Sequence, residues 1–175
     1  MRVAGLDDDG RLRAVRIQAV QILDVYFLVG DFLENLLAED APALHAMNIA
    51  FNGDTGVTAE DVRRSLLCNA EVVLIAERDG SPAGFCCAQV HRSFCYPAPV
   101  AEVTEMYVRE AFRQQGCATG MLAFLETLLQ QEGVDELHLL TGMHNQAAQA
   151  AYRSSGFRAV NEQYMKKSLP SGKKP

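Results

Sequence analysis

The chain has 175 residues, of which 22% are charged and 49% hydrophobic, and its formal net charge is −6. Its length and ordinary composition indicate one folded domain and exclude disordered and collagen-like classes. The net negative charge argues against nucleic-acid substrates and suits a cationic one. The apolar run from Ile22 to Val29 is short and contains Asp24, so it resembles neither a signal peptide nor a membrane span. We expect a single cytoplasmic domain over residues 1–175, with flexible tails at 1–12 and 170–175.

The five cysteines and four histidines show no pattern typical of a disulfide framework or a metal site. The cysteine number is odd and no pair has the CxxC spacing, which indicates free thiols in a reducing compartment. The histidines do not group with carboxylates or thiols at ligand spacing. No metal site is predicted.

The first half of the chain has the periodicity of several strands and helices. These are a strand at 12–20, a helical region at 23–50 with a break at Ala41-Pro42, a helix from Thr58 to about Leu67, and strands at 72–76 and 83–90. Thr58 is a suitable N-cap, and Glu60 and Asp61 fall in the favourable first turn. The turn at 78–81 between the last two strands is typical of a hairpin.

The stretch 102–122 changes from the period of a strand to that of a helix at a turn containing glycine. Val103, Glu105 and Tyr107 alternate with their neighbours. After the turn RQQGCATG, Met121 begins an apolar stripe at helical spacing. A helix that starts there leaves backbone N–H groups unpaired at the positive end of its dipole, which favours a phosphate. The turn has neither the Gly-Lys-Ser/Thr of an ATPase loop nor the GxGxxG spacing.

A second informative segment, HNQAAQAAYRSSGF, runs from His144 to Phe157 and follows a short predicted buried strand at 136–140. Asn145 is a good helix N-cap. Gly156 is placed as a C-terminal cap. The segment therefore predicts a short helix that ends at glycine.

Both segments resemble motifs of the GCN5-related N-acetyltransferase (GNAT) family. The family's pyrophosphate loop, Gln/Arg-x-x-Gly-x-Gly/Ala, is filled without a gap by Arg113, Gln114, Gln115, Gly116, Cys117 and Ala118. Its second motif is matched by Asn145, Ala148, Tyr152, Gly156 and Phe157. The motifs occur in the family's order, separated by a helix and a strand, and the resemblance covers about Val57 to Lys167.

The resemblance implies an α/β (α+β) GNAT fold: a mixed central sheet of about six to seven strands, about four flanking helices, and a final strand after the last helix. Splayed central strands in this fold bind acetyl-CoA, with its pantetheine arm on the backbone of Met106 and Val108. The pyrophosphate would lie on N–H groups between Gln114 and Thr119. The implied cofactor-binding residues are Met106, Tyr107, Val108, Arg113, Gln114, Gln115, Gly116, Cys117, Ala118, Thr119, Asn145, Ala148 and Tyr152.

The implied reaction is direct acetyl transfer to an amine in a ternary complex, which requires a base because an ammonium has no lone pair. Glu105 matches the acid of antibiotic-modifying members and is favoured here, whereas Glu102 matches that of histone-modifying members. The two face opposite sides of a strand unless a bulge intervenes. The N–H of Met106 or Tyr107 would hold the oxyanion, and Tyr152 would protonate the leaving thiolate.

Covalent catalysis is not expected, because no serine or cysteine is paired with a positioned base. Cys117 stands at a helix N-terminus, where the pKa of a thiol falls. The family commonly has a small or aliphatic residue there, so packing is the expected role of Cys117.

The expected acceptor is a small cationic amine, with an aminoglycoside antibiotic preferred, and the activity would then confer antibiotic resistance. Polyamine, amino-acid and protein N-acetyltransferases share both motifs and stay open as alternatives, as does a non-catalytic acyl-CoA-binding sensor module. The side chains expected to line the acceptor side are Asp31, Glu34, Asp54, Glu60 and His144. A homodimer is suggested by the edge-strand pairing of family members, and no nucleic-acid or membrane partner is expected.

Overall fold

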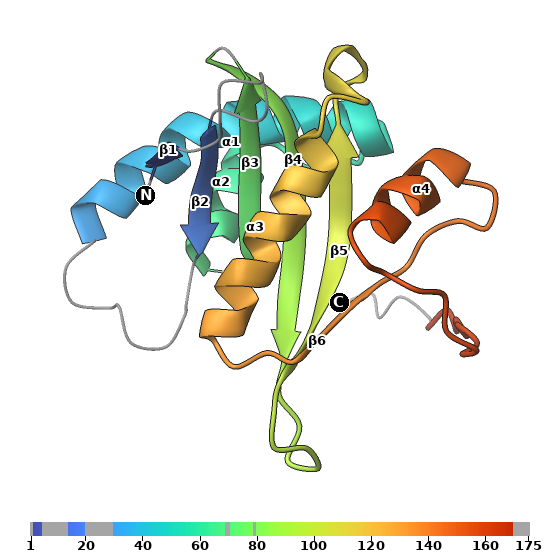
Figure 1. Cartoon of the computed structure of the whole chain (residues 1–175). Coiled ribbons are helices and arrows are strands. Elements are labelled where there is room, and N and C mark those ends of the chain that lie inside the picture. The colour runs from blue at the N-terminus through green and yellow to red at the C-terminus, as the bar shows by residue number, and fades with distance from the viewer. Residues whose placement is uncertain (1, 5–13, 20–29, 69–70, 79, 170–175) are drawn as a thin grey trace.

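The computed structural model describes residues 2–4, 14–19, 30–68, 71–78 and 80–169, with side chains described from Asp40 onward. The expected tails at 1–12 and 170–175 lie almost entirely outside these residues. The six described strands form one sheet in the order β1-β2-β3-β4-β5-β6, with helices on both faces (Figure 1). The predicted mixed sheet with about four flanking helices is confirmed.

Neighbouring strands pair antiparallel except β5 and β6, which run parallel. The strands are β1 (Arg2–Ala4), β2 (Ala14–Ala19), β3 (Val72–Arg78), β4 (Ser81–His91), β5 (Val100–Val108) and β6 (Glu136–Leu139). The helices are α1 (Gly30–Asn52), α2 (Ala59–Cys68), α3 (Cys117–Gln131) and α4 (Gln146–Ser154), with a 3-10 turn at Glu110–Phe112. The elements predicted between 12 and 154 are therefore present, with boundaries that differ by a few residues.

Helix α3 covers one face of the sheet, and α1 with α2 covers the other (Figure 1). The core under α3, called here the α3 core, includes Leu74, Cys86, Val103, Met121, Leu122 and Leu125. The α1/α2 core includes Leu44, Met47, Leu66, Val73, Ile75 and Phe85. Successive residues of β3 alternate between the two cores, as the two-residue period of a strand requires.

Strands β5 and β6 separate after four paired positions, from Val100↔Glu136 to Val103↔Leu139. β5 continues to Val108 and stays paired with β4 along its other side. In the described part of the chain, the second half of β5 thus has no strand beside it on the β6 side. Its backbone groups there are open to a ligand that pairs like a strand.

Helix α1 runs through Ala41-Pro42 without the predicted break. Proline in a helix interior costs about 3 kcal/mol relative to alanine, because it removes a backbone donor and crowds the preceding turn. Burial offsets this cost: Ala41, Leu44 and Met47, three residues apart, are only 2%, 6% and 0% exposed. The prediction is wrong because tertiary packing outweighs the local signal.

Two predictions about the C-terminal part are also wrong. β6 is half-buried, because it lies at the end of the described sheet: Leu137 and Leu139 pack on the α3 core while Glu136 and His138 are exposed. No strand follows α4 in residues 155–169. The sequence there, with Tyr164-Met165 followed by two lysines, lacks the alternation that would give a strand one apolar face.

Candidate active site

A β-bulge in β5 decides where its two glutamates point. Glu105 pairs with Cys87 of β4, and the next residue of β4 pairs with Val103, so Thr104 is the extra residue. Val103 packs in the α3 core, whereas Cys87 packs on the α1/α2 core. Because of the extra residue, Glu102 and Glu105 lie on the same α1/α2 side instead of opposite sides. Both candidate bases therefore lie on one face of the sheet.

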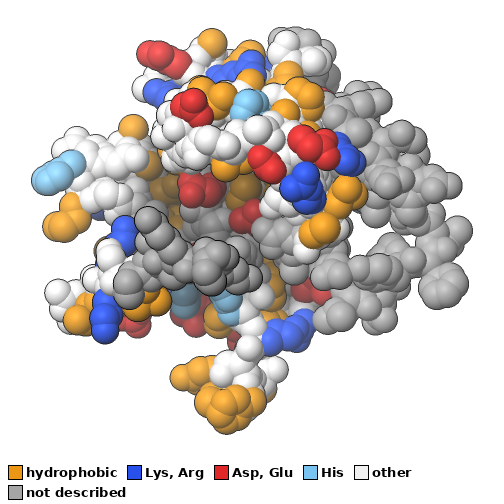
Figure 2. All heavy atoms as spheres, turned by 180° about the vertical axis from the view of Figure 1, so that it is seen from behind, with side chains coloured by type: hydrophobic (Ala, Val, Ile, Leu, Met, Phe, Trp, Pro, Cys, Tyr) orange, Lys and Arg blue, Asp and Glu red, His pale blue; other side chains and the backbone are white. Residues whose placement is uncertain are grey.

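The surroundings of the two glutamates differ. Glu105 is exposed, yet its pKa is raised, first by partial burial of the carboxyl and second by the negative charge of Glu71. Glu102 lies 4.0 Å, Oε2 to Nε2, from His91. Figure 2 views this face and shows acidic side chains beside hydrophobic ones in a hollow near its centre. A raised pKa would suit a general base that works near neutral pH.

Three aromatic rings stand on the face that carries Glu105. The Tyr107 ring lies 5.4 Å from the Phe51 ring and 6.0 Å from the Phe85 ring, centroid to centroid. Phe51 belongs to the last turn of α1, so the α1–α2 connection is held against this end of β5. Sequence reasoning missed Phe51, because only the tertiary fold brings the end of α1 to β5. An apolar wall next to a carboxylate disfavours its charged form, in agreement with the raised pKa of Glu105.

The open edge of β5 presents backbone donors toward β6. The N–H of Arg109 bonds to the carbonyl of Ala83, 2.9 Å away, and therefore points to the β4 side. N–H groups alternate in direction along a strand, so those of Met106 and Val108 point away from β4. The carbonyl of Val108 agrees with this direction, because it accepts from Nε of Arg113 at 3.0 Å. Met106, rather than Tyr107, has its N–H on the open edge.

The turn after β5 leaves backbone donors without side-chain caps. Gly116 is the N-cap of α3 at φ 81°, and no side chain caps it. Gln114, at φ 58°, is the one residue other than glycine with positive φ among those described. A Cβ added at Gly116 would have only the Thr119 Oγ1 within 4 Å, so the space over the glycine is free of protein. The first turn of α3 thus fits a phosphate group.

Arg78, at the end of β3, borders the same turn. Its Nη1 donates to the carbonyl of Gln115 at 3.4 Å. Sequence reasoning missed Arg78, because an arginine in a hairpin turn carries no signal for a loop 37 positions away. Its positive charge suits a site for phosphates.

Cys117 has the packing role predicted for it. Its side chain is buried, 2% exposed. Burial raises the pKa of its thiol, and the nearby Arg78 guanidinium offsets this effect in part. A thiol with a raised pKa is a poor nucleophile near neutral pH.

Tyr152 is held in place by the two ends of α4. Asn145 caps the helix, since its Oδ1 accepts from the N–H of Ala148 at 3.2 Å. At the other end, Gly156 adopts φ 88° and the N–H of Phe157 reaches the carbonyl of Tyr152 at 3.0 Å, as in a Schellman motif. This geometry places the ring centroids of Tyr152 and Phe157 6.0 Å apart. Asn145, Gly156 and Phe157 therefore each help to form an end of α4 or to pack against Tyr152.

Tyr152 packs against the α3 core, on the side of the sheet opposite to Glu105. Burial, and second the neighbouring Cys86, raise the pKa of its phenol. The buried Cys86 thiol has its own pKa raised to about 12. Tyr152 is thus a neutral proton donor near pH 7. A group lying along the open edge of β5 would have a proton acceptor on one side and a donor on the other.

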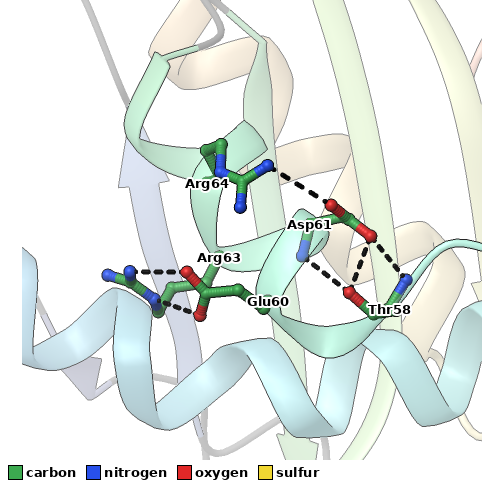
Figure 3. A network of polar contacts seen from close by, with 5 residues as sticks. All are labelled: Thr58, Glu60, Asp61, Arg63 and Arg64. Atoms are coloured by element: carbon green, nitrogen blue, oxygen red, sulfur yellow. Dashed lines mark hydrogen bonds and ion pairs between the residues drawn. The ribbon is translucent and has the colours of Figure 1, made fainter.

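The predicted N-cap of α2 is confirmed, and beside it Arg63 engages Glu60, one of the candidate acceptor residues (Figure 3). Asp61 N–H donates to Thr58 Oγ1 at 3.1 Å, and Thr58 N–H donates to Asp61 Oδ2 at 3.0 Å. Glu60 accepts from Nε and Nη2 of Arg63 at 2.8 Å each. Both oxygens of Glu60 are therefore engaged by a neighbour on the same helix, in an exposed ion pair.

Of the other candidate acceptor residues, the structure describes the side chains of Asp54 and His144, which lie in different loops. Asp54 lies in the loop after α1, where one of its oxygens accepts from the N–H of Gly56 at 2.9 Å. His144 is exposed in the turn before α4. The side chains of Asp31 and Glu34 lie outside the described residues.

Among the described side chains, no group of three His, Cys, Asp or Glu residues lies close enough to hold a metal ion. The described helices include none with the length and apolar character needed to cross a membrane.

Comparison with known proteins gives a family match. Residues 33–157 match the model of the Acetyltransferase (GNAT) family. No curated protein sequence matches the chain.

Several solved structures share the fold. An aminoglycoside acetyltransferase from an uncultured soil metagenomic sample, solved with trehalose, has TM-score 0.60 and 17% identity and covers 74% of this chain and 92% of its own. AAC(6')-Iy, solved with a bisubstrate analogue containing CoA and acetylneamine, has TM-score 0.64 and 19% identity, with coverages of 75% and 92%. A ribosomal-protein-alanine N-acetyltransferase from Brucella melitensis has TM-score 0.65 and 17% identity, with coverages of 75% and 95%.

Proposed function

The chain belongs to the GNAT acetyltransferase family, and from this premise we propose that it acetylates a primary amine of a small cationic molecule with acetyl-CoA as donor. An aminoglycoside is our first candidate for the acceptor. The observation that carries the proposal is the open edge of β5. This edge begins beside Glu105, the proposed base, and ends at the turn before α3, whose backbone N–H groups fit a phosphate.

The residues present fit acetyl-CoA. N–H groups between Gln114 and Thr119 would hold the pyrophosphate, with Arg78 adjacent. The backbone of Met106 and Val108 would pair with the extended arm along the open edge. When bound, acetyl-CoA supplies an acetyl group activated as a thioester.

Three groups of the chain would then act on the reaction. Glu105 takes a proton from the acceptor ammonium, directly or through water, which frees the nitrogen lone pair. The N–H of Met106 donates to the oxygen that gains negative charge during attack. Tyr152 donates a proton to the departing sulfur from the other side of the sheet. Direct transfer in a ternary complex needs no nucleophile from the protein.

The character of the acceptor side supports a cationic substrate. Glu105 and Glu102 face it from β5, and the chain carries a net charge of −6. We propose Asp31, Glu34, Asp54 and the exposed His144 as further acceptor contacts. Two of the similar structures are aminoglycoside acetyltransferases, which is why this class is proposed first.

The proposal is tested by release of free thiol from acetyl-CoA, followed with a chromogenic disulfide. The panel contains a kanamycin-type and a gentamicin-type aminoglycoside, a polyamine, an amino acid and a peptide with a free N-terminus. We expect turnover with an aminoglycoside and its loss in Glu105→Gln. Turnover only with another amine of the panel would assign the acceptor to that amine's class. Acetyl-CoA binding without turnover on any amine would indicate a sensor module instead.

We also propose a homodimer, supported by the outer edge of β6, which has no partner strand in the described part of the chain. The neighbouring Leu140 and Met143 are 59% and 88% exposed, so pairing there would bury apolar surface. Light scattering of the purified chain gives the mass directly. A monomer at all concentrations would contradict this proposal.

A further inference from the structure

The bulge of β5 is tied to β3 by one side-chain hydrogen bond. The hydroxyl of Thr104 donates to Oε1 of Glu71 at 3.0 Å, and this contact is partly buried. Glu71 stands directly before β3, so the bond spans the width of β4 on the α1/α2 side. A bulge residue has no partner in the strand ladder. Thr104 obtains one from Glu71 instead.

The same carboxylate acts on Glu105 through space. Partial burial and then the charge of Glu71 raise the pKa of Glu105. Burial and then the charge of Glu71 also raise the pKa of Cys87, on the strand between them. Glu71 also lines a shallow recess with Ser65, Leu66 and Val73. Its carboxylate is thus linked to the bulge by geometry and to Glu105 by charge.

We propose that Glu71 is a positioning residue for the Glu105 base: through Thr104 it holds the bulge that keeps Glu105 on the acceptor face. This inference rests on the proposed function. Without the bulge, the strand would return to simple alternation and Glu105 would turn to the face it does not share with Glu102. The proposal therefore assigns a mechanistic role to a carboxylate outside β5.

Other ionisable groups near this face either interact with other residues or stay neutral. From β4, Cys87 has a pKa held well above its ordinary value by burial, so it stays neutral. From β5, Glu102 is near His91, and Tyr107 packs in the aromatic wall. On α1 and α2, which cover the face, the ionisable residues with described interactions are Asp40, His45, Glu60, Asp61, Arg63 and Arg64.

Two variants separate the hydrogen bond from the charge. Glu71→Gln keeps an oxygen that can accept from Thr104 but removes the charge. Thr104→Val removes the hydroxyl and keeps a β-branched side chain of similar shape. Glu132→Gln, at the C-cap of α3, is the matched control because it makes the same change in net charge at the helix that covers the opposite face of the sheet from Glu105.

The direct readout is the titration of the Glu105 carboxyl by 13C NMR, which needs no substrate. We expect the midpoint to move to lower pH in Glu71→Gln and to stay unchanged in Glu132→Gln. The acid limb of kcat/KM, which reports the free enzyme, should move in the same direction. In Thr104→Val we expect kcat to fall by about 10-fold, a partial loss of the base effect, with unchanged affinity for acetyl-CoA.

Wild-type kcat in Thr104→Val would overturn the positioning role, and an unchanged Glu105 midpoint in Glu71→Gln would remove the electrostatic link between Glu71 and Glu105. If Glu71→Gln does not fold, Glu71→Asp takes its place: it keeps the charge but shortens the reach to Thr104, so kcat should fall without the loss of charge. If no amine is acetylated at all, the proposed function fails, while the NMR titration still decides whether Glu71 controls Glu105.

Discussion

The proposed cofactor side and the proposed acceptor side of this molecule are built in different ways. The proposed cofactor side is mostly one continuous segment: β5, the turn at 109–116 and the start of α3 follow one another directly, with Arg78 and α4 added from elsewhere. The acceptor side is assembled from the end of α1, the residue before β3, the middle of β4 and a bulge in β5. A site made by one segment depends on local backbone conformation. A site made by several segments depends on the register and packing of the whole sheet.

The largest expected effect is on the acceptor side. Glu105→Gln should lower the acetylation rate by about 10²-fold or more near neutral pH, as loss of a general base does. Affinity for acetyl-CoA, measured by calorimetry, should stay unchanged because the cofactor side is untouched. The deficit should shrink at high pH, where the free amine is already populated.

Glu102→Gln is the matched comparison, since it removes a carboxylate from the same face of the same strand. We expect a much smaller loss of rate. If Glu102→Gln lowers the acetylation rate and Glu105→Gln does not, the base is Glu102. The raised pKa of Glu105 would then not mark the base.

The next largest effect should appear on the cofactor side. Gly116→Val fills the space over the turn and forces a β-branched residue to φ 81°, which costs about 1–2 kcal/mol of stability. Gly133→Val is a matched control at the other end of α3, at φ 72° with no atom within 4 Å of an added Cβ. Both variants should lose similar stability. Only Gly116→Val should lose acetyl-CoA affinity, by about 10-fold or more.

Equal affinity for acetyl-CoA in Gly116→Val and Gly133→Val would remove the turn from the cofactor site. The comparison between the two sides would then no longer hold, because no continuous segment would bind the cofactor.

The same difference explains what the sequence could predict. The turn at Gly116 and the caps at Asn145 and Gly156 were predictable, because each depends on a few neighbouring residues. Phe51 and Glu71 were not, since nothing local marks them as neighbours of β5. The sequence could not predict the bulge at Thr104, because the bulge follows from how β4 and β5 pair. It could only indicate that a bulge would place Glu102 and Glu105 on the same face. The break at Pro42 failed for the opposite reason: a strong local signal was outweighed by burial.

A moderate effect is expected where the two sides meet. Tyr152→Phe should lower turnover without abolishing it, because a thiolate with a reference pKa of about 8.5 is a tolerable leaving group. The ring and its packing on Phe157 are kept, so acetyl-CoA affinity and melting temperature should stay near wild type. Acyl donors with a more acidic thiol should reduce the deficit. Tyr164→Phe, at a tyrosine that is 68% exposed, is the control.

Full turnover of Tyr152→Phe on its best substrate would leave Tyr152 as a wall of the cofactor channel. The sulfur would then take its proton from water, and the α3 side of the sheet would have no chemical role.

The smallest expected effect is a change in folding stability in Glu105→Gln, and its direction follows from the pKa shift of Glu105. The pKa of Glu105 is raised in the folded chain, so its proton favours folding below the unfolded pKa of about 4.3, and this contribution is lost as pH rises through the folded pKa. Glu105→Gln removes the charged form and should raise the melting temperature slightly near pH 7. The gain should vanish near pH 4. A lower melting temperature at pH 7 would show that the carboxylate stabilises the fold.

The four-position pairing of β5 with β6 has a consequence for the order of events at the site. Few backbone bonds join the segment from β6 to α4 to the rest of the sheet, so this segment is expected to open locally at less cost than global unfolding. Acetyl-CoA lying along β5 would touch both parts and lower the rate of amide hydrogen exchange in α4. Tyr152 would then be set in place by the cofactor itself, and the acceptor would arrive at a site that the donor has already closed.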